Sequence, residues 1–386
     1  RPFFSFSFAN PSSFHSAGLT VQRAVQRARK SIASMVNVRE DEVIFCSGGT
    51  ESDNLALLGV IRFAASKPHV ITSAIEHPAV LVTLQQLQKR KEIDLTMLPV
   101  DSYGRVNPKQ VASAIRKETI LISIMYANNE IGTIQPIAEI GREILKWRKT
   151  SQTPYPYFHS DACQAAGVLD LDVQKLHTDL LTFNGSKIYG PKGIGVLVVK
   201  RGMKLEPLIY GGGQEKGLRS GTENVPGIIG IATALEIAQE MKNQENNRLI
   251  ALRDRLTKGL LKIPKSRLNG HPADRLPNNV NISFLDIEGE AAVLYLDAKG
   301  VQASTGSACA STTLDPSHVI LATGVSYEAA HGSIRFTLGR STTQEEIDFV
   351  IKIMPGIVKK LRHMSPVNLD TKYFGHGHQV VRSLGH

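Results

Sequence analysis

The chain has 386 residues, of which 42% are hydrophobic and 21% charged, with a mean hydropathy of −0.10. No uninterrupted apolar run approaches the roughly 20 residues of a membrane helix, so no spanning segment is expected. Three cysteines in so long a chain exclude a disulfide-stapled secreted protein and favour a reducing, cytoplasmic compartment. The net charge of +10 is spread over scattered basic residues, so no direct binding of nucleic acid is predicted.

Strand and helix patterns alternate through the first two thirds of the chain. Helical spacing is found at residues 19–36, 51–65, 78–89, 108–116 and 136–149. Short apolar strands are predicted at 42–46, 69–72, 96–100, 119–126, 157–160 and 180–183. This alternation indicates an α/β fold with a mainly parallel sheet and helices on both faces.

The pattern changes after Pro226, where a smaller α+β domain is expected. A long helix is predicted at 228–263, followed by strands at 279–284, 300–304 and 333–338 and helices at 289–299, 315–322 and 343–363. Thr342 and Glu345 are expected to form the capping box of the last helix.

Three regions follow from these patterns. We expect a large domain at 1–227, a small domain at 228–364 and a disordered tail at 365–386, whose histidines are interpreted as solvated, so no metal site is predicted. Residues 1–8 fit neither a signal peptide nor a complete first strand, and we expect that a front segment is missing.

Polar residues follow the predicted strands, at the edge of an α/β sheet where ligands bind. Glycines and hydroxyls at 47–52 open a helix and suit an anion, and His77 follows the next strand. Asp161 and Lys187 follow two later strands. Pyridoxal phosphate needs a lysine for its Schiff base, a carboxylate for its ring nitrogen and a cradle for its phosphate. Asp161 and Lys187 are therefore candidates, and the candidate phosphate ligands are Gly49, Thr50 and Ser186.

Several motifs together resemble the NifS-like cysteine desulfurases, which are fold-type I pyridoxal-phosphate enzymes of the class V aminotransferase group. They appear in the order typical of that family, over roughly residues 8–364. The segments are 47–54, 76–77, 128–132, 159–164, 186–193, 211–215, 219–222, 306–309 and 333–336. The resemblance implies the fold of the family's large domain, a homodimer, and conversion of L-cysteine to L-alanine with transfer of sulfur.

The resemblance also implies roles for single residues. Lys187 would form the Schiff base and move protons, His77 would stack on the ring and assist them, and Cys309 would carry the persulfide. The other cofactor ligands would be Asp161 at the ring nitrogen, Gln164 and Asn128 near the ring hydroxyl, Gly49, Thr50 and Ser186 at the phosphate, and Thr222 from a second subunit. Arg335, with Asn128, would bind the substrate, because a guanidinium group holds a carboxylate in two places.

Cys309 fits the carrier role on composition as well. Residues 303–313 are all small, which predicts an exposed, mobile loop, whereas Cys46 and Cys163 are expected to be structural. Ser186 stands where the family usually has histidine. The sulfur acceptor is expected to be a protein, for example an iron–sulfur scaffold or a tRNA-thiolation protein, and the sequence leaves open which pathway it serves. The alternatives are a selenocysteine lyase and a non-catalytic homologue that acts as a binding scaffold, although the presence of both Lys187 and Cys309 favours an enzyme.

Overall fold

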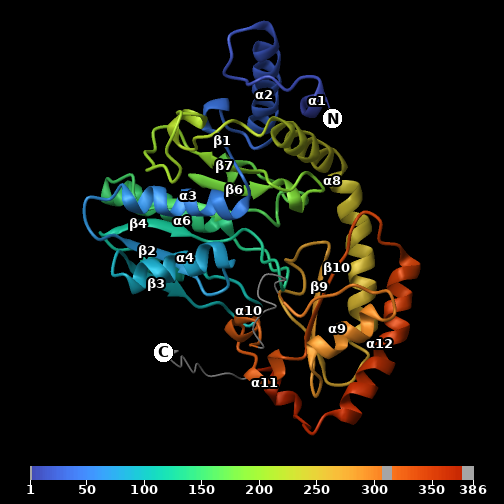
Figure 1. The fold of residues 1–386 in the computed structure, drawn as a ribbon. Coiled ribbons are helices and arrows are strands. Elements are labelled where there is room, and N and C mark those ends of the chain that lie inside the picture. The colour runs from blue at the N-terminus through green and yellow to red at the C-terminus, as the bar shows by residue number, and fades with distance from the viewer. Residues whose placement is uncertain (1, 307–314, 376–386) are drawn as a thin grey trace. The chain divides into compact units, whose positions relative to one another are not determined.

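The computed structural model describes residues 2–306 and 315–375, and its chain forms two compact units (Figure 1). The first unit comprises Arg1–Leu98, Asn107–Ala127 and Gln135–Lys242, and the second comprises Pro99–Val106, Asn128–Ile134 and Asn243–His386. The domain limits expected from the sequence, 1–227 and 228–364, stay a prediction.

A seven-stranded sheet forms the centre of the first unit, in the order β1-β7-β6-β5-β4-β2-β3. The strands are β1 (Val43–Cys46), β2 (His69–Ser73), β3 (Asp94–Leu98), β4 (Thr119–Ser123), β5 (Tyr157–Asp161), β6 (Leu180–Asn184) and β7 (Gly195–Val199). Only β7 runs antiparallel to its neighbours in this sheet, so the predicted α/β class with a mainly parallel sheet is confirmed. Strand β7 itself was not predicted from the sequence.

Helices connect the strands of the first unit (Figure 1). They are α1 (Pro2–Ser5), α2 (Ser16–Met35), α3 (Gly49–Arg62), α4 (Pro78–Lys89), α5 (Pro108–Ala114), α6 (Ile137–Ser151) and α7 (Val173–Leu176), with short 3₁₀ turns at η1 (Glu40–Glu42), η2 (Gly185–Lys187) and η3 (Glu215–Gly217). Helices α4 and α5 each begin with proline, preceded by a side chain that accepts a backbone hydrogen bond. This combination satisfies the first orphan N–H groups and fixes where each helix starts.

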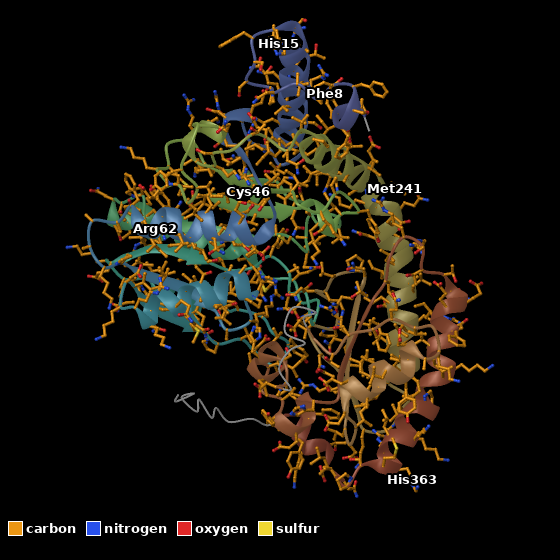
Figure 2. The ribbon with its side chains drawn as sticks, in the orientation of Figure 1. Phe8, His15, Cys46, Arg62, Met241 and His363 are labelled. Carbon is orange, nitrogen blue, oxygen red and sulfur yellow. The ribbon has the colours of Figure 1, made fainter. Side chains whose placement is uncertain are left out.

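In the first unit, most strand side chains are buried, whereas many side chains near the N-terminus are exposed. The strands carry fully buried Phe158 and Phe183, and Cys46 at the end of β1 is 3% exposed. Phe8 and His15, labelled in Figure 2 with Cys46, are both exposed and lie beside α1 and α2. Helix α8 (Val225–Leu260) then runs without a break past Lys242, where the first unit ends.

The second unit contains a three-stranded antiparallel sheet in the order β10-β9-β8. Its strands share a hydrophobic core with helices α9 and α12. Its elements are β8 (Ser266–Leu268), β9 (Asn279–Phe284), α9 (Gly289–Asp297), α10 (His318–Ala322), α11 (Tyr327–Ala330), β10 (Ser333–Thr337), α12 (Gln344–Met364) and η5 (Thr371–Phe374). Among the helices in the described parts of the chain, none combines the length and apolarity needed to cross a bilayer.

Two sequence predictions in the second unit were wrong. Residues 300–304 do not form a strand, because Gly300 turns the chain with a positive φ and only Ser304 forms a bridge, to Arg335. The capping box of α12 lies one residue later than predicted and uses Thr343 and Glu346. The Thr342 hydroxyl instead accepts the N–H of Gly339, so it is not the cap.

Candidate active site

The sheet brings four of the predicted site residues, His77, Asp161, Gln164 and Lys187, to one edge of the first unit. Strands β5 and β6 are adjacent and parallel, with Asp161 opposite Thr182, so Asp161 and η2 with Lys187 emerge at the same edge. The charges of Asp161 and Lys187 both act on the Cys163 thiol, so both groups lie near it. His77 follows β2 and Gln164 follows β5, both half-buried at the carboxyl ends of parallel strands.

Asp161 is a buried carboxyl group, 6% exposed, held by its own turn. Its Oδ1 accepts the N–H of Cys163 at 2.8 Å, and its backbone carbonyl accepts the N–H of Tyr126 at 2.8 Å. These contacts fix the last residue of β5, whereas Lys187 is exposed and lies at the end of η2. A fixed carboxylate and an accessible amine are the two groups that pyridoxal phosphate requires.

His77 is oriented by helix α4. It is the N-cap residue, and its Nδ1 accepts the N–H of Ala79 at 3.1 Å. A nitrogen that accepts a hydrogen bond cannot carry the proton of a neutral imidazole, so the neutral ring is protonated on Nε2. The structure therefore assigns which nitrogen of His77 carries a proton in the neutral ring.

The N-terminus of α3 lies where the phosphate ligands are predicted. A Cβ added to Gly49 would lie 2.8 Å from the Cys163 sulfur and 3.1 Å from Asn184 Nδ2, so only glycine allows this close packing. Thr50 and Ser186 are exposed beside it, on α3 and η2. The first N–H groups of a helix and its positive dipole end attract a phosphate. Together with Asp161 and Lys187, this donor set fits pyridoxal phosphate.

Two ion pairs hold the loop that carries Thr222. Arg219 Nε donates to Glu51 Oε1 at 2.9 Å, which joins the loop to the first turn of α3. Arg29 on α2 pairs with buried Glu215 at 2.6 Å, and Glu215 also accepts the N–H of Phe45. Thr222 is exposed at the end of this loop.

The remaining predicted residues belong to the second unit. The Asn128 side chain is buried, and its Oδ1 accepts the N–H groups of Glu130 and Ile131 at 2.8 and 3.0 Å. Arg335 lies on β10, and its Nη1 donates to the carbonyl of Asn129 at 2.8 Å. Arg335 thus contacts the segment that contains Asn128. Cys309 lies outside the described residues.

Three buried titratable side chains beneath Asp161 were not assigned a role from the sequence. They are Asp53 on α3, Glu76 after β2 and His159 on β5, with exposures of 1%, 1% and 0%. Burial raises the pKa of Glu76 to about 8 and lowers the pKa of His159 to about 3. Burial, with the charges of Asp161 and Glu76, raises the pKa of Asp53 well above its usual range. One signal was available, since His159 precedes Asp161 by two positions and so shares its face of the strand.

The two described cysteines are buried, and neither is suited to carry sulfur. Burial raises the pKa of Cys46 to about 12, and it raises that of Cys163 well above the usual range, helped by Asp161 and Asp53. A thiol is nucleophilic only as a thiolate, and both groups are held as thiols.

Comparison with known proteins agrees with this geometry. Residues 1–350 match the family described as aminotransferase class-V. The chain is 52% identical to the cysteine desulfurase IscS of Methanosarcina thermophila over 95% of this chain and 89% of that protein. It is 48% identical to the cysteine desulfurase IscS 1 of Archaeoglobus fulgidus over 95% of this chain and 94% of the relative.

Solved structures are similar over most of the chain as well. One described as a NifS-like protein superposes with a TM-score of 0.85 at 36% identity, over 93% of this chain and 94% of the other. Another, described as SspA in complex with cysteine, gives a TM-score of 0.74 at 34% identity, over 88% and 93% of the two chains. The chain belongs to the aminotransferase class-V family and, within it, to the pyridoxal-phosphate-dependent cysteine desulfurases.

Proposed function

We propose that this chain converts L-cysteine to L-alanine and passes the sulfur, as a persulfide on Cys309, to an acceptor thiol. The observation that carries the residue assignment is the pairing of β5 with β6, which brings Asp161 and Lys187 to one edge of the sheet. The same edge follows β1, where the N-terminus of α3 provides the anion cradle. Family membership supports the reaction itself.

The first unit supplies the groups that hold the cofactor. Pyridoxal phosphate, when bound, supplies an electron sink for the carbanion formed beside the substrate amino group. The Lys187 amine would hold the cofactor and would move the proton of the substrate Cα, and Asp161 would keep the ring nitrogen protonated. His77 would stack on the ring, and a proton that its neutral imidazole gave up would come from Nε2, since Nδ1 accepts from Ala79.

The phosphate end is assigned to hydroxyl and backbone donors. Gly49 and Thr50 supply N–H groups at the start of α3, and the hydroxyls of Thr50 and Ser186 are exposed beside them. Thr222 is proposed to come from the second subunit of a homodimer. Ser186, in the usual place of histidine, keeps a donor to phosphate but offers no imidazole. Gln164 and Asn128 are assigned to the region of the ring hydroxyl.

Substrate binding is assigned to the second unit. The guanidinium of Arg335 fits the carboxylate of L-cysteine in two places, with Asn128 as a further contact. The Cys309 thiolate then attacks the substrate sulfur, so an S–S bond forms as the C–S bond breaks. The electron pair of the C–S bond is protonated to give the methyl group of alanine. The similar structure described with bound cysteine supports this substrate class.

We further infer the setting of the reaction. Cys46 and Cys163 are free thiols, which agrees with a reducing cytoplasm. The acceptor is a protein thiol, for example on an iron–sulfur scaffold or on a tRNA-thiolation protein. No nucleic acid or membrane takes part directly.

Purified protein supplied with pyridoxal phosphate tests the assignment. L-Cysteine and a reducing thiol should give equal amounts of alanine and sulfide, with selenocysteine as the competing substrate. Lys187→Ala should lose the visible absorbance of the bound cofactor and all turnover. Cys309→Ser should keep the absorbance but lose at least about a hundredfold in alanine release, because a serine hydroxyl is a poor nucleophile at neutral pH. Full activity in the serine variant would reject the carrier role of Cys309.

A further inference from the structure

The loop that carries Thr222 contains a turn in an unfavourable backbone conformation. Within η3, Glu215 and Lys216 have positive φ angles of 47° and 61°, and Gly217 follows with 80°. Residues other than glycine rarely adopt this left-handed region. Two consecutive residues of this kind persist only where their surroundings hold them in place.

The Glu215 side chain is the part of this turn that is most firmly held. It is 3% exposed, and its two oxygens accept hydrogen bonds from the two terminal nitrogens of Arg29, at 2.6 and 2.8 Å. Its Oε2 also accepts the N–H of Phe45 in β1 at 2.9 Å. A two-point pair between arginine and a carboxylate is among the strongest side-chain hydrogen bonds, so Glu215 fixes η3 against β1.

Arg29 is itself fixed by the strand next to it. Its Nη1 also donates to the carbonyl of Val43, and its guanidinium lies over the Phe45 ring, 4.6 Å from the ring centre. These contacts join α2 to β1 and set the plane in which the guanidinium meets Glu215. A lysine has one nitrogen and no planar group, so it could not make all of these contacts together.

Hydrogen bonds within the loop lead from the turn to Thr222. Gln214, the residue that caps η3, accepts the N–H of Gly221 at 2.9 Å through its Oε1. The hydroxyl of Ser220 accepts the N–H of Gly213 at 3.3 Å. The two ends of the loop are thus bonded to each other, so a turn that is fixed at η3 also fixes the backbone directly before Thr222.

The Arg29–Glu215 pair lies apart from the proposed cofactor ligands. Among the described residues, the hydrogen bonds of these two side chains reach Val43, Phe45 and each other. None of these residues is assigned to the cofactor. An effect of the pair on cofactor binding therefore has to pass through the loop.

We propose that Arg29 and Glu215 are positioning residues, whose pair holds η3 in its left-handed conformation and thereby places Thr222 at the cofactor phosphate of the second subunit. This inference rests on the proposed role of Thr222 and on the proposed homodimer. Loss of the pair weakens cofactor binding through the phosphate alone, and it does so in the partner subunit's site.

Hydrogen exchange of the full chain tests the hold on the loop without turnover. In Glu215→Gln, the backbone N–H groups of residues 213–221 should exchange at least about tenfold faster, because an amide cannot accept from both guanidinium nitrogens. Asp348→Asn is the matched control, since it breaks another two-point pair, with Arg255, that is exposed on α12. It should leave residues 213–221 unchanged. Wild-type exchange of this loop in Glu215→Gln would overturn the proposal.

Cofactor binding, followed by visible absorbance, tests the positioning. The dissociation constant of pyridoxal phosphate should rise about tenfold in Glu215→Gln and in Arg29→Lys, which is the effect of one lost charge-assisted hydrogen bond. Pyridoxal lacks the phosphate, so each variant should bind it as wild type does. An equal loss for both ligands would show general damage to the site and would overturn the positioning role. If Glu215→Gln does not fold, Arg29→Lys, which keeps the charge beside Glu215, decides.

Thr222→Val separates this inference from the proposed function, because it removes the proposed phosphate contact itself. If Thr222→Val leaves the affinity for pyridoxal phosphate unchanged, the assignment of Thr222 fails, and the positioning role fails with it. If Thr222→Val weakens binding but Glu215→Gln does not, only the inference about the pair fails.

Mixed dimers test which site the pair serves. In these dimers one subunit carries Lys187→Ala, so only the other subunit can form the Schiff base with the cofactor. Glu215→Gln should weaken cofactor binding when it is in the Lys187→Ala subunit and should have no effect when it is in the other one. The reverse pattern would overturn the placement of Thr222 at the partner's site.

Discussion

The buried proton on Glu76 should make the stability of the first unit fall as the pH rises. The Glu76 side chain is 1% exposed, and its carboxyl group accepts the N–H of Met125 at 3.1 Å and a short hydrogen bond from Ser73. Burial raises its pKa from 4.5 to about 8. The stabilising contribution of the bound proton is complete below pH 4.5 and is lost as the pH rises through about 8, since the unfolded chain releases that proton first.

The size of the effect follows from the same shift. Each pH unit inside this window changes the free energy of unfolding by about 1.4 kcal/mol, so the three units from pH 5 to pH 8 amount to about 4 kcal/mol at most. Glu76→Gln removes the titration but keeps an oxygen that can accept from Met125 and Ser73. The stability of the variant relative to wild type should therefore rise by about 3–4 kcal/mol from pH 5 to pH 8.

Urea unfolding followed by tryptophan fluorescence measures this difference. Trp147 is the single tryptophan and lies on α6, so it reports on the first unit. His159 has the opposite dependence, because its lowered pKa makes stability fall as the pH drops below 6.5, but it is present in both proteins and cancels in the comparison. Glu240→Gln is the matched control, because it makes the same change at an exposed residue of α8. Parallel pH curves for wild type and Glu76→Gln would refute the reasoning.

Two further variants test the cofactor cradle and the substrate site. Gly49→Ala places a methyl group 2.8 Å from the Cys163 sulfur, so the dissociation constant of pyridoxal phosphate should rise about tenfold. Adding Cys163→Ala should recover most of the lost affinity. Equal affinity in the single and double variants would contradict the steric cause. Arg335→Lys keeps the charge but not the two-point fit to a carboxylate. KM for L-cysteine should therefore rise about ten- to a hundredfold, with an unchanged cofactor spectrum. An unchanged KM would remove Arg335 from the substrate site.

Local sequence signals predicted many of the elements well. Helix α4 begins and ends as expected, at Pro78 and Lys89, because His77 and Pro78 together define its start. Strand β9 (Asn279–Phe284) also has its predicted bounds. Strand β7 was missed because its apolar run directly follows the segment 186–193, which was interpreted only as a cofactor motif. An antiparallel strand after a short connection does not continue the strand–helix alternation on which the prediction depended.

Long-range contacts explain the features that local patterns could not predict. Residues 128–134 belong to the second unit although they follow a strand of the first. Arg275 Nη2 donates to the carbonyl of Ile131, and the side chains of Asn279 and Asn281 donate to the carbonyl of Glu130. These partners are about 150 positions away in the sequence, as the separations of 144, 149 and 151 show. No periodicity within residues 128–134 indicates them.

The same limit applies to the candidate site. Asp161 and Lys187 were found because a parallel sheet collects its strand ends at one edge, a rule that needs no side-chain positions. The raised pKa values of Asp53 and Glu76 could not be predicted, because they result mainly from burial and, to a lesser extent, from the carboxyl group of Asp161, and both depend on the folded packing. A polar residue inside a helix pattern indicates only that one position interrupts an apolar face.

Helix α3 connects the two charged ends of the proposed cofactor site. Its first turn contains Gly49 and Thr50 at the anion cradle, and its second turn contains Asp53 beneath Asp161. The ion pair of Glu51 with Arg219 holds the first turn, and buried Asp53 on the second turn lies with Oδ1 3.5 Å from His159 Nε2. Because an α-helix is stiff over two turns, the distance between the phosphate donors and Asp53 is fixed by its backbone. One helix can therefore help to set the spacing between the two ends of the proposed cofactor site.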